Sequence, residues 1–274
     1  MTAVVVVGAG WIGRAVATSA GVTAVARRAF TGEDWPRGSS VVVASGRSVI
    51  AGSEGLAVPL HDELAHLRLV LDVAERNKAR RIVVIGSCDV AGMAPVIDGT
   101  TPQDPRTTYA EVKAALEDEC VLRHDRGAPV TYLRMAPVHG PGKQRTSALV
   151  ALSRLPVVPL PNGGNHSTGF LLLADAVRAV CYLLSHSAPA VQSAGSGNTP
   201  LRQLLQCLAE EQGRVFRGMA VPVPGRTVAR LWGAGGPDRL QWAIRLACAR
   251  SVLMEPRVTP TPLRKASQML VQTC

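Results

Sequence analysis

A short apolar run that leads directly into a glycine-rich turn is the feature that most constrains the fold of this chain. Residues 3–7 read AVVVV, and GAGWIG follows at residues 8–13, ahead of a helical segment. A short β-branched run closed by glycine is typical of a strand buried on both faces of a parallel sheet. Glycines at this spacing let a pyrophosphate approach the backbone and lie on the helix N-terminus. The sequence therefore predicts a dinucleotide-binding turn; a glycine-rich turn without a ligand is the alternative. The expected contacts are Gly8, Gly10, Trp11, Ile12 and Gly13.

Strands and helices alternate along the chain after this turn. Strands are expected at residues 22–26, 41–45, 81–87 and 129–137, with helical segments between most of them. This order predicts an α/β fold with right-handed crossovers and a doubly wound parallel sheet of the Rossmann type. Only about a dozen residues connect Arg28 to Ser40, whereas a single crossover already takes at least about 10 to 12 residues. We therefore predict that the outermost strand on that side of the sheet, after residue 28, is missing or vestigial.

A smaller second lobe is expected in the C-terminal half. Prolines and glycines at residues 156–164 interrupt the elements that follow Pro141. We assign residues 1–138 and 167–196 to the Rossmann domain, and residues 139–166 and 197–274 to a substrate-binding lobe. This lobe is expected to cover the C-terminal edge of the sheet, because doubly wound sheets bind ligands at that edge.

Composition narrows the classes of protein. The 274 residues are 47% hydrophobic and 18% charged, which is enough for one large α/β domain with a buried core. The net charge of +10 comes from scattered arginines without interleaved aromatic residues, which argues against a nucleic-acid partner. Six widely spaced cysteines without a CxxC pattern indicate no metal site and fit a reducing cytoplasm. We expect neither a signal peptide nor a membrane-spanning segment, because no suitable apolar run is present.

The end of the second expected strand favours NADP over NAD. An NAD site offers an acidic residue to the ribose hydroxyls at this place, whereas an NADP site offers arginine to the 2′-phosphate. Here the strand ends at Arg27 and Arg28, with no acidic residue before Glu33. NADP is therefore the favoured cofactor and NAD is the alternative; a pair of solvated arginines is the simplest other interpretation.

A tyrosine and a lysine four residues apart mark a second candidate site. Tyr109 and Lys113 lie in TTYAEVK, and three tyrosines and four lysines give roughly 0.04 expected chance matches to this spacing. Residues four apart project from one face of a helix. An ammonium group beside a phenol favours the phenolate, whose acid has a reference pKa of about 10. The pair is therefore predicted to carry proton transfer, and an exposed helix start is the alternative.

These motifs together resemble those of the extended short-chain dehydrogenase/reductases, also called the NAD-dependent epimerase/dehydratase family. The likeness covers residues 1–210. GAGWIG resembles the cofactor turn of that family, and TTYAEVK resembles the segment with its catalytic tyrosine and lysine. RIVVIGSCDVAG, LRMAPVHGPG and GFLLLADAVRAV resemble three further segments in the family's order. A Rossmann fold and a nicotinamide cofactor are what this resemblance implies.

The resemblance also implies a role for each site residue. Ser87 would hydrogen-bond the substrate oxygen, Tyr109 would transfer the proton, and Lys113 would hold the nicotinamide ribose. Besides the glycine turn and the two arginines, the implied cofactor contacts are Ala44, Ser45, Tyr109, Lys113, Ala136, Pro137 and Val138. The implied substrate contacts are Ser87, Cys88, Asp89, Tyr109 and His139. His139 and Pro137 stand where the family commonly has tyrosine and asparagine, so the pocket is expected to differ from that of its relatives.

The favoured function is an NADPH-dependent reductase of a ketone on a sugar or sugar-like small molecule. A nucleotide-sugar epimerase or dehydratase with tightly bound NAD is the alternative. Dehydratases of the family often have Asp-Glu after the serine position, where this chain has Cys88 and Asp89. A non-catalytic cofactor-sensing or RNA-binding relative is the second alternative, supported only by the basic charge. By the same resemblance, the helical segments 62–78 and 109–126 would pair in a homodimer.

Overall fold

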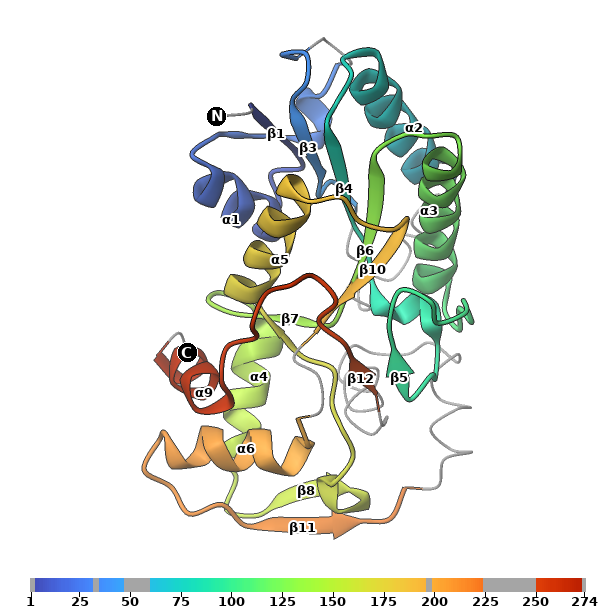
Figure 1. Cartoon of the computed structure of the whole chain (residues 1–274). Helices are drawn as coiled ribbons and strands as arrows, with labels where there is room; N and C mark the ends of the chain where they lie inside the picture. Colours follow the sequence, from blue (N-terminus) through green and yellow to red (C-terminus); the bar gives the residue numbers. More distant parts are fainter. Residues whose placement is uncertain (1–2, 32–34, 47–59, 196–198, 224–249, 273–274) are drawn as a thin grey trace.

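A parallel six-stranded sheet forms the centre of the computed structural model, which describes residues 3–31, 35–46, 60–195, 199–223 and 250–272 (Figure 1). The strands lie in the order β10-β6-β4-β3-β1-β2, and every neighbouring pair is parallel. Their bounds are β1 Val4–Val7, β2 Ala24–Val25, β3 Ser40–Val43, β4 Arg81–Ile85, β6 Val130–Met135 and β10 Val191–Ala194. The chain winds outward from β1 in both directions, so the predicted doubly wound α/β fold is confirmed.

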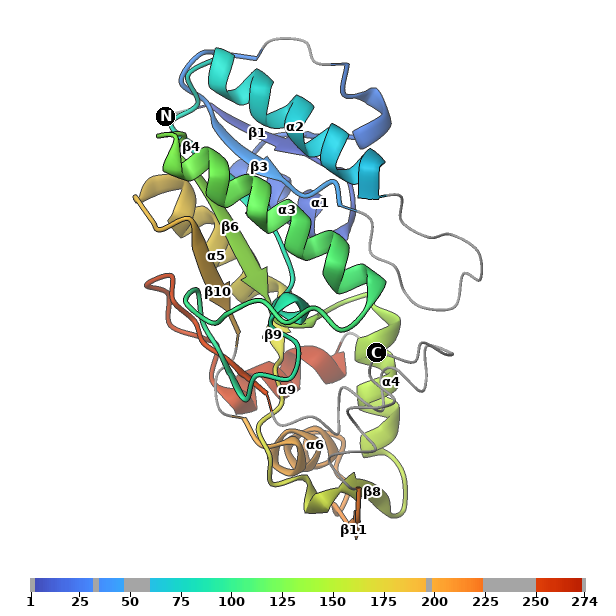
Figure 2. The same ribbon diagram turned by 90° about the vertical axis from the view of Figure 1, so that its right-hand side faces the viewer.

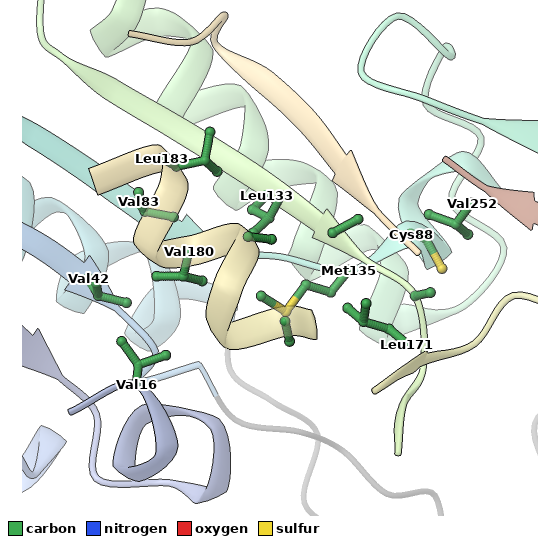
Figure 3. Packing of buried hydrophobic residues seen from close by; sticks show 14 of the residues in the cluster. Val16, Val42, Val83, Cys88, Leu133, Met135, Leu171, Val180, Leu183 and Val252 are labelled. Carbon is green, nitrogen blue, oxygen red and sulfur yellow. The ribbon is translucent and has the colours of Figure 1, made fainter. Parts of the chain in front are cut away.

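Helices cover both faces of this sheet (Figures 1 and 2). One face carries α1 (Trp11–Ala20) and α5 (Leu173–Ser185), and the other carries α2 (Leu60–Arg76) and α3 (Thr108–Asp125). Successive strand residues point to opposite faces, so Val42 packs towards α5 while Val41 packs towards α2. Figure 3 shows Val83 and Leu133 beside Val42, with Val180 of α5 next to them. Burial on both faces explains why the strands read as continuous apolar runs.

The sheet ends at β2 in the described part of the chain. This strand is two residues long and pairs only with β1, and the short helix η1 (Arg27–Ala29) follows it. No further strand lies in residues 29–31 or 35–39, and β3 begins at Ser40. The predicted loss of the outermost strand is confirmed, because the connection is too short for a helix and another strand.

A smaller group of elements lies beyond the C-terminal ends of the strands (Figure 1). It consists of α4 (Gln144–Ser153), β8 (Val158–Pro161), the turn η3 (Asn162–Gly164), α6 (Leu201–Glu210), β11 (Gly218–Val221) and α9 (Leu263–Gln272). Leu149, Leu160 and Leu204 are fully buried in its own apolar core, to which Phe170 and Leu172 also contribute. We propose that this group is the substrate lobe assigned from the sequence to residues 139–166 and 197–274.

Two short parallel pairings join this group to the end of the sheet. β7 (Val138–His139) pairs with β9 (Leu171–Leu172), and β12 (Ser251–Val252) pairs with β5 (Val96–Ile97). The second pairing brings residues far apart in the sequence to the turn η2 (Cys88–Ala91), which follows β4. The C-terminal segment therefore helps to build the edge at which a ligand is expected.

A buried ion pair fixes α3 on the sheet. The Arg134 guanidinium on β6 donates to both carboxylate oxygens of Glu117 on α3, at 2.8 and 2.5 Å. Its remaining Nη1 donates to the backbone oxygens of Asp98 and Thr101. The two side chains are only 3% and 2% exposed. Separating the two partners would leave each charge buried and uncompensated, so the ion pair holds α3 in one position on the sheet.

Candidate functional site

The three glycines of the first turn serve different purposes. Gly8 has φ +114°, and a Cβ there would lie 2.4 Å from the backbone of Ala44 and Ser45. A Cβ on Gly13 would lie 1.8 Å from the Gly8 carbonyl oxygen, so this residue lets α1 pack against the turn. A Cβ on Gly10 would meet no atom within 4 Å among the described residues. The turn is therefore tightly packed against the protein at Gly8 and Gly13 and open at Gly10. Its open part lies at the N-terminus of α1, where an anion is favoured.

Trp11 connects this turn to the segment after β7. Its indole Nε1 donates to the Pro141 carbonyl oxygen at 3.0 Å, and the Lys143 ammonium lies 4.7 Å from the ring centroid. Ala44 also lies behind the turn, because its Cβ is 3.3 Å from the position of a Gly13 side chain. Ala136, Pro137 and Val138 follow at the end of β6. These predicted cofactor contacts therefore surround the same end of the sheet.

The two arginines after β2 have different surroundings. Arg27 donates to the Glu63 carboxylate and, at 2.9 Å, to the Asp62 carbonyl oxygen, so it ties η1 to the first turn of α2. Arg28 is exposed and has no hydrogen bond or ion pair with the described residues. Ser45, another predicted contact, is buried, and its hydroxyl lies 2.7 Å from His66 Nε2. The structure thus leaves Arg28 as the accessible member of the pair.

Tyr109 and Lys113 are placed by the start of α3. The Thr107 hydroxyl accepts from the Ala110 amide at 3.1 Å, which caps the helix directly before the pair. Lys113 is 5% exposed, and its Nζ lies 5.6 Å from the centroid of the Tyr109 ring. Burial lowers the pKa of Lys113, while the charge of Glu63 raises it and that of Arg27 lowers it. Its Nζ makes no hydrogen bond or ion pair with any described residue, so a polar ligand would fit there.

A buried tyrosine brings Ser87 close to this pair. The Tyr132 hydroxyl on β6 donates to the Lys113 carbonyl oxygen at 2.9 Å, and the same phenol lies beside the Ser87 backbone amide. A Cβ on Gly86 would lie 2.2 Å from the Tyr132 ring, so only glycine fits before Ser87. Ser87 is 8% exposed, and its hydroxyl accepts from the Asp89 amide at 3.2 Å. The backbones of Lys113 and Ser87 therefore both contact one buried phenol.

The next two residues face the C-terminal segment. The Arg250 guanidinium donates to the Asp89 carboxylate at 3.0 Å and to the Cys88 carbonyl oxygen at 2.7 Å. All three residues are at most 5% exposed. Substrate contacts by Cys88 and Asp89 stay predictions. Sequence reasoning missed Arg250, because nothing distinguished it from the many other arginines, and it missed Glu63 and Lys143 for the same lack of a motif.

His139 lines a cavity of about 40 Å³ between the sheet end and the smaller lobe. Cys88, Arg145, Phe170 and Arg250 are among the other residues that line it. His139 Nδ1 is buried and has no hydrogen-bond partner among the described residues. Burial, followed by the charge of Arg145, lowers the pKa of His139 to about 3. The imidazole is therefore neutral near physiological pH and can offer a hydrogen bond to a polar group in the cavity.

A known protein family accounts for more than half of the chain. Residues 40–194 match the model of the NAD dependent epimerase/dehydratase family. The chain belongs to this family. Among curated proteins, none matches the sequence. The match to the family model confirms the resemblance seen in the motifs, and the shared core runs from β3 to β10.

Solved structures share the fold at low sequence identity. RMD from Pseudomonas aeruginosa, complexed with NADPH, has a TM-score of 0.68 and 18% identity, with 99% of this chain and 98% of that chain covered. UDP-glucose 4-epimerase from Thermus thermophilus, in complex with NAD, has a TM-score of 0.68 and 17% identity, with coverage of 99% and 98%. MoeE5 in complex with UDP-glucuronic acid and NAD has a TM-score of 0.70 and 18% identity, with coverage of 98% of each chain. At these identities the likeness establishes the fold alone.

The surface of α2 and α3 carries ion pairs within the chain. Arg123 pairs with Asp72, Glu75 and Glu119, and Leu69 and Leu122 are 42% and 44% exposed on the same two helices. The homodimer through these helices stays a prediction.

Within the described ranges, no helix is long and apolar enough to cross a membrane, and no three metal-ligating side chains come together.

We expect Gly13→Ala and Gly10→Ala to differ in stability. Gly13→Ala forces a Cβ onto the Gly8 carbonyl and is expected to lower the free energy of unfolding by about 1–3 kcal/mol. Gly10→Ala places a Cβ in open space on an extended backbone. It is expected to change the free energy of unfolding by less than about 0.5 kcal/mol. Urea denaturation measures both values. Equal losses in the two variants would contradict the packing described for the turn.

We expect acid to destabilise the protein partly through His139. The unfolded imidazole binds a proton at its ordinary pKa of 6.5, whereas the pKa of the folded one is about 3, so stability falls as the pH drops through this window. His66, whose pKa burial lowers to about 4, acts in the same direction. His139→Gln should therefore lose less stability between these pH values, as followed by urea denaturation. His61→Gln, on the exposed side of α2, is the control, and identical pH dependence in both variants would refute the assignment.

Proposed function

We propose that this protein is an NADPH-dependent reductase of a ketone on a sugar or sugar-like substrate. One observation carries the proposal: the Lys113 ammonium is buried beneath Tyr109 without a hydrogen-bond partner among the described residues. A sensing or RNA-binding protein has no use for a buried cation at this place, because burial of an unpaired charge is costly. A reductase uses the cation to hold a cofactor hydroxyl and to stabilise a phenolate.

In this proposal the described residues divide the work of the reaction. NADPH, when bound, supplies the hydride for the carbonyl carbon. The Ser87 hydroxyl donates a hydrogen bond to the carbonyl oxygen and orients it, and the Tyr109 phenol gives that oxygen its proton. The Lys113 ammonium stabilises the negative charge left on Tyr109. The product is an alcohol.

In this proposal the smaller lobe forms the part of the site that binds the substrate. The cavity beside His139 is lined mostly by apolar residues, with Arg145 and Arg250 at its polar positions. A neutral imidazole and the charge of Arg145 suit a hydroxylated molecule that carries negative charge, since Asp89 already offsets the charge of Arg250. MoeE5 is complexed with UDP-glucuronic acid and the Thermus protein is a UDP-glucose 4-epimerase, which agrees with a sugar-like substrate here.

A nucleotide-sugar epimerase or dehydratase with tightly bound NAD is the second candidate. The engagement of Arg27 by Glu63 favours it, because only one of the two arginines then remains for a 2′-phosphate. Such an enzyme returns the hydride to the same molecule and keeps its cofactor. Purified protein that carries stoichiometric NAD, detected by mass spectrometry of the released nucleotide, would support this candidate over a reductase.

We expect Tyr109→Phe to abolish reduction while cofactor binding remains. Loss of the proton donor should lower kcat with keto-sugar substrates at least about 100-fold, measured by NADPH oxidation. The dissociation constant for NADPH, from fluorescence titration, should stay near the wild-type value because the ring remains. Tyr182→Phe on α5, where the ring stacks on His186, is the control and should leave both quantities unchanged. Surviving activity in Tyr109→Phe would show that another group donates the proton.

We expect Arg28→Ala to weaken NADPH binding but not NADH binding. A charge-assisted hydrogen bond to a phosphate contributes about 1.5–3 kcal/mol, so the dissociation constant for NADPH should rise roughly 10-fold or more. Titration with both cofactors measures the ratio. Arg126→Ala, at the C-terminal end of α3, removes the same net charge elsewhere and should change neither constant. An equal loss for NADPH and NADH would overturn the role of Arg28 in recognising the 2′-phosphate.

A further inference from the structure

Glu63 is a buried acid that the sequence motifs do not account for. It lies in the first turn of α2 and is 3% exposed. Its Oε1 accepts from Arg27, and its Oε2 lies 3.8 Å from the point that a Cβ on Gly46 would occupy. The Lys113 Nζ lies 2.5 Å from the same point. The Glu63 carboxylate and the Lys113 ammonium therefore both approach Gly46, in the segment that follows β3.

Charged and titratable groups from α2, η1, α3 and β6 lie around Lys113. Glu63 comes from α2 and Arg27 from η1, and both contribute to its pKa. Tyr109 comes from the same helix, and Tyr132 of β6 donates to its backbone oxygen. His66, also on α2, is neutral, because burial lowers its pKa to about 4. Within this described shell, Glu63 is the acid that offsets the burial of the ammonium.

We propose that Glu63 is a positioning residue that acts through Lys113, by keeping its ammonium group in place beside Gly46. The proposal rests on the proposed function in one respect only, namely that the Lys113 ammonium serves the reductase reaction. Burial favours the neutral amine of Lys113, and a neutral amine stabilises neither a phenolate nor a polar cofactor group. The Glu63 charge opposes this effect, whereas the Arg27 charge adds to it.

Arg27 belongs to the same charged cluster, and its effect on the pKa of Lys113 is opposite to that of Glu63. Its guanidinium is held by Glu63, by the Asp62 carbonyl oxygen and, at 3.4 Å, by the Ser45 carbonyl oxygen. These bonds hold the guanidinium at Oε1 of the carboxylate, whereas Oε2 is the oxygen near Gly46, so the charge of Glu63 acts on both cations. Removing Glu63 and removing Arg27 should thus change the charge of Lys113 in opposite directions. A residue that only stabilised the fold would change it in the same direction in both variants.

Carbamylation by cyanate tests the proposal without any cofactor, because cyanate reacts only with the neutral amine. The labelling rate of Lys113 is followed peptide by peptide by mass spectrometry at neutral pH, with exposed Lys78 as the internal reference. In Glu63→Gln the rate at Lys113 should rise about 10-fold, since an opposite charge at this range has that effect on the amine. In Arg27→Gln it should fall, and in the conservative variant Glu63→Asp it should stay near the wild-type rate. Lys78 should be unchanged throughout.

An unchanged rate at Lys113 in Glu63→Gln, or a rise in both Glu63→Gln and Arg27→Gln, would overturn the proposal. A second measurement is the dissociation constant for NADPH in Glu63→Gln, with and without Lys113→Met. Glu63→Gln should weaken binding on its own and have no further effect when Lys113 is absent. An effect that persists in the double variant also overturns the proposal. If wild-type protein binds no NADPH, the proposed function fails, and the labelling result alone decides the role of Glu63.

Discussion

The packing of Tyr132 between Gly86 and α3 is the contact on which the rest of the candidate site depends. The phenol occupies the space that any side chain at residue 86 would fill, and its hydroxyl holds the Lys113 backbone oxygen. The strand end with Ser87 and the helix with Tyr109 and Lys113 are therefore fixed to one buried ring. The ion pair between Arg134 and Glu117 secures the same helix one turn further along.

Charge around this framework is arranged in two separate buried groups. In one group, Glu63 accepts from Arg27 and approaches Gly46 together with the Lys113 ammonium. In the other, Asp89 pairs with Arg250, which reaches η2 from the C-terminal segment. Each acid offsets a cation that would otherwise be buried alone, which is the condition for keeping charge inside a protein.

The C-terminal segment is part of the site rather than an appendage to it. β12 pairs with β5, and the Thr261 amide and hydroxyl donate to the Asp175 carboxylate at the start of α5. Asp175 lies in the segment that resembles the family, and its buried carboxylate accepts from both Thr261 and Arg178. The small cavity at His139 exists because these distant segments meet.

The sequence by itself determined the sheet, the glycine turn and the Tyr109–Lys113 pair. Continuous apolar runs, glycines at fixed positions and a four-residue helical spacing are local patterns, which depend only on residues that are neighbours in the chain. The missing strand was also predictable, because the length of a connection limits what it can contain. The different surroundings of Arg27 and Arg28, and the roles of Glu63 and Arg250, were decided by the tertiary structure alone. Whether a charged side chain is exposed or paired depends on residues brought beside it from elsewhere in the chain, and no local pattern records that.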